Sequence, residues 1–228
     1  MQNIPLSNLL FIFLPALLTV FIVWRWTDNA RTSLHALARM VIQLILIGYA
    51  LSYIFLSEQV FLVCSVLGVM LVAAAWISLR PVDRSLRLFS EALLSIFVVN
   101  ACLLFVISAG VLTIDPWFKP SILIPLAGMV FASGMNSVSL FVERYYAELS
   151  SGAELQFARN AAFNATMIPT INGLFAVGLV SLPGMMTGQI LSGVSPLIAV
   201  RYQIMIMLML FSSAGLTVAL FHTLLTRR

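Results

Sequence analysis

Few side chains in this sequence have the types and spacing that catalysis requires. The two histidines, His35 and His222, have no carboxylate nearby in the sequence, so we expect neither to act as a general acid or base. The single lysine, Lys119, lies in IDPWFKP and not in the GxxxxGK[ST] pattern with which a P-loop holds phosphates. Cys64 and Cys102 lack the CxxC spacing of a metal site. The sequence therefore predicts no enzyme, no resident cofactor and no metal site, and it assigns any ATP hydrolysis to another chain.

Polar residues inside apolar stretches are the second place to look for function. Such residues are costly in a membrane and tend to mark helix contacts or a pathway. Ser133, Asn136 and Ser137 share one helical face, since they are spaced at i, i+3 and i+4. Two interpretations stay open: hydrogen bonds between helices through small residues, and a transport pathway, for which Asn136 is the candidate lining residue.

The stretch MIPTINGLFAVGLVSLPGMMTGQILSGVSP has an unusual pattern for a membrane span. Pro169 and Pro183 are only 14 positions apart, which corresponds to about 21 Å of helix rise. Broken helices at membrane depth are tolerated where the backbone lines a cavity or is covered by protein. The pattern predicts a functional kink or gate, with a simple proline kink as the alternative. The candidate pathway or gate residues around this break are Thr170, Asn172, Pro183, Gly184, Met185, Met186, Thr187 and Gln189.

The composition of the chain indicates what kind of fold must position these residues. Of the 228 residues, 61% are hydrophobic and only 9% are charged. A soluble domain is nearer 45–50% apolar and about 25% charged. This composition argues against a soluble enzyme and a nucleic-acid-binding protein, and it favours a polytopic protein of the lipid bilayer.

The apolar runs predict an all-α fold with about seven transmembrane helices. The runs are long and continuous, whereas a membrane barrel would need short alternating strands. The expected spans are 6–24, 38–56, 59–79, 91–113, 121–141, an interrupted run at 167–190, and 197–224.

The basic residues predict the orientation. With the N-terminus outside and the C-terminus in the cytoplasm, ten arginines face the cytoplasm, and only Lys119 and Arg201 face outward. This distribution satisfies the positive-inside rule and makes the polar segment 142–166 cytoplasmic. The ten are Arg25, Arg31, Arg39, Arg80, Arg84, Arg87, Arg144, Arg159, Arg227 and Arg228.

Four stretches of the chain resemble a known family. They are SLPGMMTGQILSGVSPLIAVRYQIM (181–205), MIPTIN (167–172), ARMVIQLILIGYALSYIF (38–55) and IPLAGM (124–129). Together they are similar to FetB-type permeases, the membrane subunits of an ABC transporter associated with bacterial iron export. Plant aluminium-tolerance half-transporters belong to the same family.

The resemblance implies a single transmembrane permease domain over residues 1–228 that works with a separate ABC ATPase subunit. It also implies the export of a metal ion across the bacterial inner membrane, with iron resting on the resemblance alone. Because one chain of seven helices offers only half a translocation path, we expect a homodimer of the permease with two ATPase chains. The coupling loop would be residues 147–169, which overlap the polar segment 142–166, and Glu154-Leu155 there replaces the family's usual Thr-Pro. The residues implied at the ATPase contact are Glu148, Gly152, Ala153 and Arg159.

Two alternatives remain open. The chain could be a secondary transporter or channel that works alone, in which case Glu91, at the edge of the fourth span, is the best-placed acid for ion coupling. The segment 142–166 could also be an amphipathic helix lying on the lipid headgroups instead of a contact for an ATPase.

Overall fold

The described secondary structure is almost entirely helical. The computed structural model describes residues 5–27, 29–55 and 59–227, and no β-strand forms among them. Contacts between elements divide the chain into two units, Met1–Ser57 and Glu58–Arg228. The all-α fold expected from the sequence is confirmed. The single permease domain expected over 1–228 stays a prediction.

The first unit is a pair of long helices, α1 (Leu6–Trp26) and α2 (Ala30–Ile54), which contact each other. Their large apolar side chains are mostly exposed within the unit: Phe11, Trp26 and Tyr49 each keep more than two thirds of their surface. A soluble protein rarely exposes so continuous an apolar surface, so these side chains are suited to lipid.

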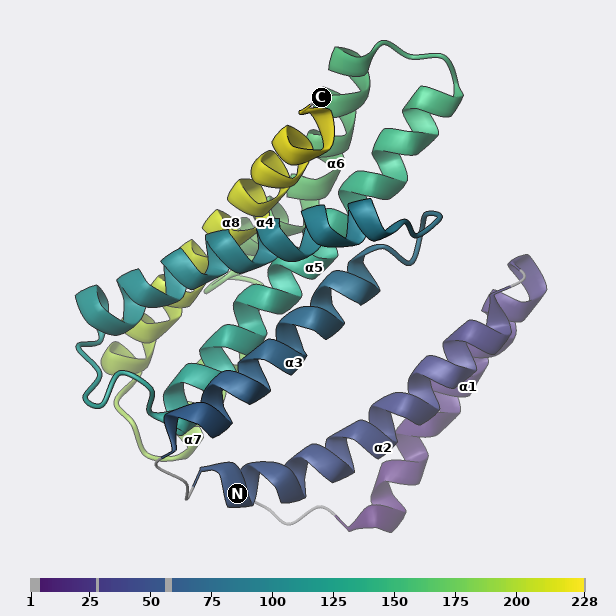
Figure 1. Cartoon of the computed structure of the whole chain (residues 1–228). Helices are drawn as coiled ribbons and strands as arrows, with labels where there is room; N and C mark the ends of the chain where they lie inside the picture. Colours follow the sequence, from purple (N-terminus) through teal and green to yellow (C-terminus); the bar gives the residue numbers. More distant parts are fainter. Residues whose placement is uncertain (1–4, 28, 56–58, 228) are drawn as a thin grey trace. The chain divides into compact units, whose positions relative to one another are not determined.

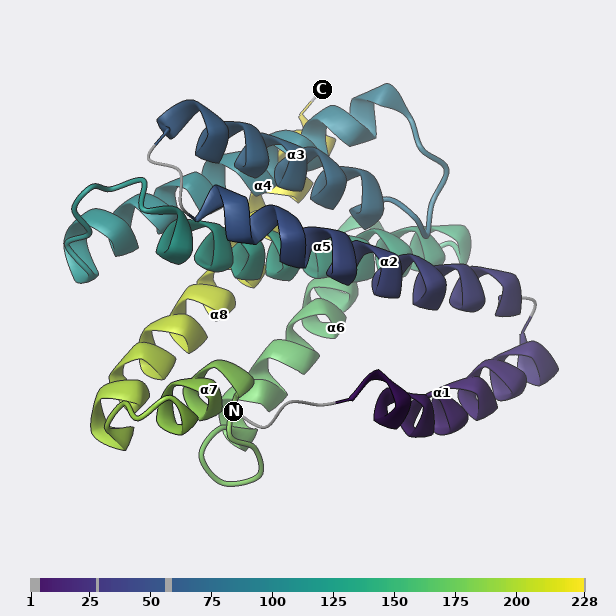
Figure 2. The same cartoon turned by 90° about the horizontal axis from the view of Figure 1, so that it is seen from below.

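The second unit is built around α5, which packs against α3, α4, α6 and α8 (Figures 1 and 2). A single-turn π-helix, η1, continues α4, and the short helix α7 packs against α8. The helices of this unit are α3 (Val60–Ser78), α4 (Leu86–Phe105), η1 (Val106–Val111), α5 (Pro120–Ser150), α6 (Leu155–Ala176), α7 (Gly184–Leu191) and α8 (Pro196–Thr226).

Buried polar groups join α4, α5 and α8 at the centre of this unit. The Ser213 hydroxyl lies 2.6 Å from the Asn100 Oδ1 and 3.0 Å from the Val130 carbonyl oxygen, both of which can accept its proton. The Asn100 amide donates to the Ile96 carbonyl at 2.8 Å. Gly134 permits this approach, because a Cβ there would lie 3.1 Å from the Asn100 Nδ2. Hydrogen bonds between small polar residues therefore hold these three helices together, as is common in membranes.

Six described helices are long and apolar enough to cross a membrane: α1, α2, α3, α4 with η1, α5 and α8. They correspond to six of the seven expected spans. The interrupted run at 167–190 does not form one element, because its first part belongs to α6 and its last part forms α7. Pro169, expected near a break, lies inside α6. The chain leaves the helix only after Ala176, and a turn around Gly178, with φ +83°, leads to Pro183 at the N-terminus of α7.

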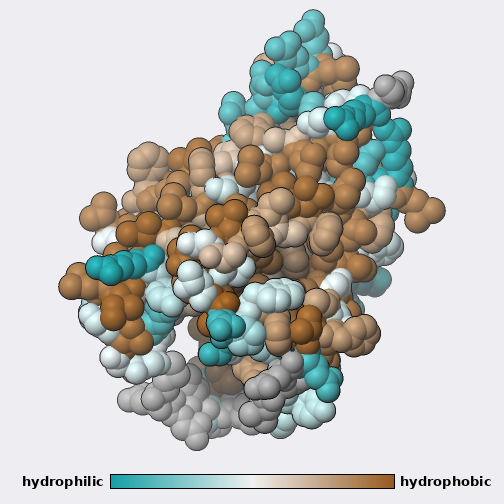
Figure 3. All heavy atoms as spheres, turned by 60° about the vertical axis from the view of Figure 1, so that its left-hand side comes forward, coloured by the Kyte–Doolittle hydropathy of each residue, from teal (hydrophilic) through white to brown (hydrophobic). Residues whose placement is uncertain are grey.

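Charged residues gather at one end of the second unit, which we call the basic end. The α3–α4 connection, the α5–α6 turn and the end of α8 lie there, whereas the α4–α5 connection and α7 lie at the opposite end (Figure 1). Figure 3 shows apolar residues over the middle of the visible face and hydrophilic residues gathered at its upper end. Arg228 lies outside the described residues. The other arginines of this unit that the sequence predicts on the cytoplasmic side are Arg80, Arg84, Arg87, Arg144, Arg159 and Arg227.

Candidate functional site

The polar segment 142–166 is not an element of its own, because it comprises the end of α5, a tight turn at 151–154 and the start of α6. The helix α5 continues to Ser150, and α6 begins at Leu155. The Gly152 and Ala153 amides donate to the carbonyls of Leu149 and Glu148, at 3.0 and 3.1 Å. This is the Schellman arrangement, and it requires the left-handed backbone that Gly152 adopts at φ +87°. Gly152 and Ala153 thus have a structural role in capping α5.

Glu148 already has a partner within its own helix. Its carboxylate forms an ion pair with Arg144, one turn earlier. The Glu148 side chain is only 13% exposed, while that of Arg144 is 51% exposed. At this turn, the more accessible charge is therefore the guanidinium of Arg144 and not the carboxylate that the sequence singled out.

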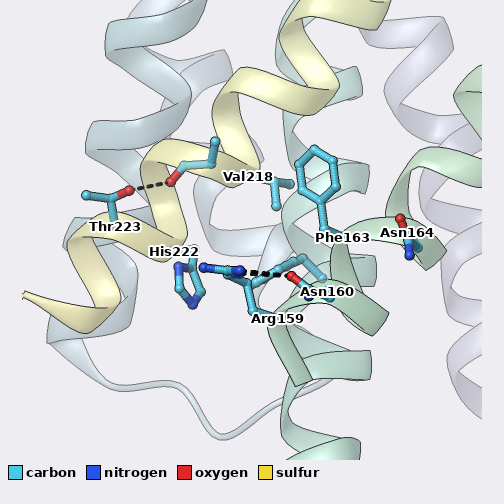
Figure 4. Close-up of a pocket in the computed structure, with 9 residues that line it drawn as sticks. Arg159, Asn160, Phe163, Asn164, Val218, His222 and Thr223 are labelled. Carbon is cyan, nitrogen blue, oxygen red and sulfur yellow. Dashed lines mark hydrogen bonds between the residues drawn. The ribbon is translucent and has the colours of Figure 1, made fainter. Parts of the chain in front are cut away.

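Arg159 faces α8 across a cleft at the basic end, which we call the α6–α8 cleft (Figure 4). Its guanidinium donates from Nε and Nη2 to the Asn160 Oδ1, at 3.1 and 3.0 Å. The cleft has a volume of about 450 Å³. Its lining residues are Phe141, Arg159, Asn160, Phe163, Asn164, Val218, Ala219, His222 and Thr223.

Two of the predicted pathway residues, Asn136 and Thr170, line a second depression of about 450 Å³, which we call the α5–α6–α8 groove. Ser133 also lines it, but its hydroxyl donates to the Leu210 carbonyl of α8 at 3.1 Å. Ser133 therefore joins α5 to α8, as one of the two interpretations expects, while Asn136 lines the groove and its role in a pathway stays a prediction. The lining residues are Met129, Ala132, Ser133, Asn136, Ser137, Leu140, Thr166, Pro169, Thr170, Gly173, Met207 and Leu210.

The other residues predicted for a pathway or gate do not line this groove. Asn172 is exposed on α6, and Pro183 begins α7 at the end opposite the basic end. Gly184, Met185, Met186, Thr187 and Gln189 all belong to α7. The Thr187 hydroxyl donates to the Pro183 carbonyl at 3.1 Å, while the Gln189 Oε1 is buried with no hydrogen-bond partner among the described residues.

The structure also joins residues that the sequence did not connect. Arg87 donates from Nε to the Glu91 Oε1 at 2.8 Å and from Nη2 to the Leu225 carbonyl at 3.4 Å, which ties the start of α4 to the end of α8. The Glu91 side chain is 11% exposed, and its Oε2 has no partner among the described residues. Small polar residues four apart in the apolar α8, Ser213 and Thr217, were the available signal for the buried contacts of that helix.

The α5–α6–α8 groove offers both polar and apolar groups for binding a ligand. Hydroxyl, amide and thioether groups line the groove together with apolar side chains. Among the described residues, no group of three or more His, Cys, Asp or Glu side chains is placed to hold a metal ion.

The helices, their apolar surfaces and their charged ends define a multi-pass membrane protein. The chain belongs to the family described as uncharacterised protein family UPF0014, which it matches over residues 6–228. No solved structure matches the chain.

Three relatives illustrate the family. The chain is 36% identical over 217 residues to "UPF0014 membrane protein slr1647" of Synechocystis, an alignment that covers 88% of this chain and 84% of the relative. It is 33% identical to "Probable iron export permease protein FetB" of Escherichia coli, over 81% of this chain and 76% of the relative. It is 28% identical to "Protein ALUMINUM SENSITIVE 3" of Arabidopsis thaliana, over 79% and 71%. The family resemblance inferred from the sequence is confirmed.

Proposed function

We propose that this chain is the permease subunit of an ABC transporter that exports a metal ion with ATP hydrolysed on a separate ATPase chain. The observation that carries the proposal is the alignment with a relative named an iron export permease, which extends over 81% of this chain. Iron and the outward direction come from that name. The groove formed by α5, α6 and α8 supports a transport role, because it places accessible polar groups between long apolar helices.

The proposed topology has seven spans, with α6 as the seventh. A helix of 22 residues is about 33 Å long, which matches a hydrocarbon core of about 30 Å. An odd number of spans places the two termini on opposite sides of the membrane, which we propose is the bacterial inner membrane. The distribution of basic residues then favours an outside N-terminus and a cytoplasmic C-terminus. The basic end then faces the cytoplasm, as the positive-inside rule requires.

The proposed contact with the ATPase is the α5–α6 turn, with Glu148, Gly152, Ala153 and Arg159. At 31 residues, α5 is about 46 Å long, which exceeds the hydrocarbon core, so its last turns extend into water. The hydrogen-bonded cap at Gly152 and Ala153 links the two helices with little freedom. A rigid turn can transmit the closure of an ATPase dimer to α5 and α6 as a rigid-body movement.

The proposed assembly is a homodimer of the permease bound to two ATPase subunits. The α5–α6–α8 groove is open on one side, so two copies that face each other would form one pathway lined by Asn136 and Thr170. The break after α6 and the helix α7 would form the outer gate. Its proposed residues are Asn172, Pro183, Gly184, Met185, Met186, Thr187 and Gln189.

Copurification tests the proposal directly. Solubilisation of native membranes should recover the chain with an ABC ATPase, and ATP hydrolysis by the complex should respond to a metal ion screened from a panel. A Gly152→Val variant should weaken the complex, while Ser192→Ala, at the opposite end, should leave it intact. Transport by the chain alone in liposomes, driven by an ion gradient and without ATP, would contradict the proposal and support the stand-alone alternative.

A further inference from the structure

The α6–α8 cleft contains a combination of side chains of which the proposed transport role uses only Arg159. The two helices contribute matching sets of positions at i, i+1, i+4 and i+5, which are Arg159, Asn160, Phe163 and Asn164 on α6, and Val218, Ala219, His222 and Thr223 on α8. The two helices run in opposite directions (Figure 1), so the polar ends of both sets meet at the basic end. The result is a polar rim above an apolar floor.

The rim gathers hydrogen-bond donors around one permanent positive charge, that of Arg159. Arg159, Asn160, His222 and Thr223 come together there, and Figure 4 shows the Arg159 guanidinium between the His222 ring and Asn160. Arg159 donates to Asn160 from Nε and Nη2, while its Nη1 makes no hydrogen bond to the described residues. No lining residue is acidic. Such a rim favours an anion with several acceptor oxygens, because a guanidinium matches the geometry of phosphate.

The floor of the cleft is largely apolar, with Asn164 beside Phe163, and a stripe of exposed apolar side chains follows it along α6. Phe163 and Val218 lie one helical turn deeper than Arg159 and His222. Beyond Asn164, the side chains of Ile168, Ile171 and Phe175 follow at helical spacing, and all three are exposed. A free phosphate ion would use only the rim. A ligand with a phosphate and an alkyl chain would use the rim, the floor and this apolar stripe together.

We propose that the α6–α8 cleft binds the phosphate of an anionic phospholipid, with Arg159 and His222 at the phosphate and the acyl chain along Phe163 and the α6 stripe. The cleft lies at the end of the helices where the charged residues gather, which is the depth of the headgroups. Basic pockets between membrane helices on the cytoplasmic side are suited to such headgroups. Arg159 belongs both to this cleft and to the proposed ATPase contact, but the proposal concerns a lipid bound to the permease itself, and its test needs no ATPase.

The test uses the full chain purified in detergent and reconstituted in nanodiscs that contain equal amounts of phosphatidylglycerol and phosphatidylcholine. Native mass spectrometry then measures which lipid the protein retains. We expect enrichment of phosphatidylglycerol, and a loss of about tenfold in Arg159→Gln, since a charge-assisted hydrogen bond is removed. Arg227→Gln is the matched control, because it removes the same charge at the same end without lining the cleft.

A second variant changes no charge, and it tests the cleft even if Arg159→Gln does not fold. Ala219→Trp fills the cleft while every donor stays in place, and it should also abolish the enrichment. Equal retention of both lipids by the wild type, or an equal loss in Arg227→Gln, would overturn the proposal. A third arm adds excess inorganic phosphate: the lipid should stay bound, and its displacement would show a site for free phosphate and overturn the assignment to a lipid.

Discussion

Gly134 lies where α4, α5 and α8 come closest, and its missing side chain makes room for polar groups from two other helices. A Cβ at this position would lie 3.1 Å from the Asn100 Nδ2 and 3.4 Å from the Thr217 Oγ1. The first distance is shorter than an ordinary van der Waals contact, and the second lies at the lower limit of one. The Asn100 amide is held in turn by its hydrogen bond to Ile96, so it cannot move away without losing that bond. A single glycine therefore sets how closely three helices can pack.

The first prediction concerns this position. Gly134→Ala should lower the free energy of unfolding by about 1–3 kcal/mol, because it overpacks the contact between the helices. The matched control is Gly173→Ala on α6, where the nearest atom to a new Cβ is the Met207 Cε at 3.9 Å. That variant should be neutral or up to about 1 kcal/mol more stable, since alanine favours helix. Unfolding in mixed micelles measures the free energy of unfolding of both variants. Equal effects of the two substitutions would refute the close packing of helices at Gly134.

The second prediction concerns Gly152, whose backbone conformation caps α5. Gly152→Val should cost about 1–3 kcal/mol, because a β-branched residue is strained at φ +87°. Gly152→Asn should be tolerated far better, since asparagine adopts this conformation more readily. The control is Gly188→Ala in α7, where an added Cβ meets no atom within 4 Å. Thermal unfolding measures the order of stability among these variants. A valine variant as stable as the asparagine variant would contradict the role of Gly152 as the cap of α5.

At the scale of elements, the sequence predicts the apolar helices but not where the interrupted run breaks. Length and continuous apolarity are enough to identify six spans, because neither depends on packing. The sequence pattern predicts the break around Pro169 and Pro183. However, α6 continues through Pro169, and the chain turns at Gly178, where φ is +83°. Proline inside a membrane helix is tolerated when its surroundings satisfy the freed carbonyl, so its presence alone does not locate a break.

At the candidate sites, the sequence predicts which residues share a helical face, but not which helices pack together. Helical spacing alone places Ser133 and Asn136 on one face of α5. No spacing rule connects Asn136 with Thr170 on α6, or Arg159 with His222 on α8, because these pairs meet only when the helices pack. The polar groups are thus identifiable from the sequence, but their partners are not.

The third prediction tests the α5–α6–α8 groove as a pathway element. Asn136→Leu and Thr170→Val should each lower metal-stimulated ATP hydrolysis by the permease–ATPase complex about tenfold, because each removes a polar contact for the substrate. Both residues face the groove and are incompletely buried, so the fold should be kept. Thr19→Val on α1 is the control, since it removes a comparable hydroxyl that donates to the Pro15 carbonyl. Unchanged stimulation in both groove variants would exclude this groove from the pathway.

At the scale of the whole molecule, whether α6 crosses the membrane decides if the two ends of the chain lie on the same side or on opposite sides. Six helices satisfy the requirements of length and apolarity, and six spans would place the two ends of the chain on the same side. If α6 also crosses, seven spans place them on opposite sides. Within the second unit, the α5–α6 turn and the end of α8 lie together at the basic end, as expected if α6 crosses (Figure 1). The decisive comparison is therefore between the two ends of α6.

The fourth prediction places these two ends on opposite sides of the membrane. Single cysteines at Glu154 and Ser192 report on them, because Glu154 precedes α6 and Ser192 follows α7, and both are exposed. Cys64 and Cys102 are first replaced by alanine, since both are free and exposed. In intact cells, a membrane-impermeant maleimide should label Ser192→Cys, while Glu154→Cys should react only after permeabilisation. Lys119→Cys, in the α4–α5 connection, provides the outward control. Protection of Ser192→Cys together with Glu154→Cys would mean that α6 does not cross, and it would refute the seven-span topology.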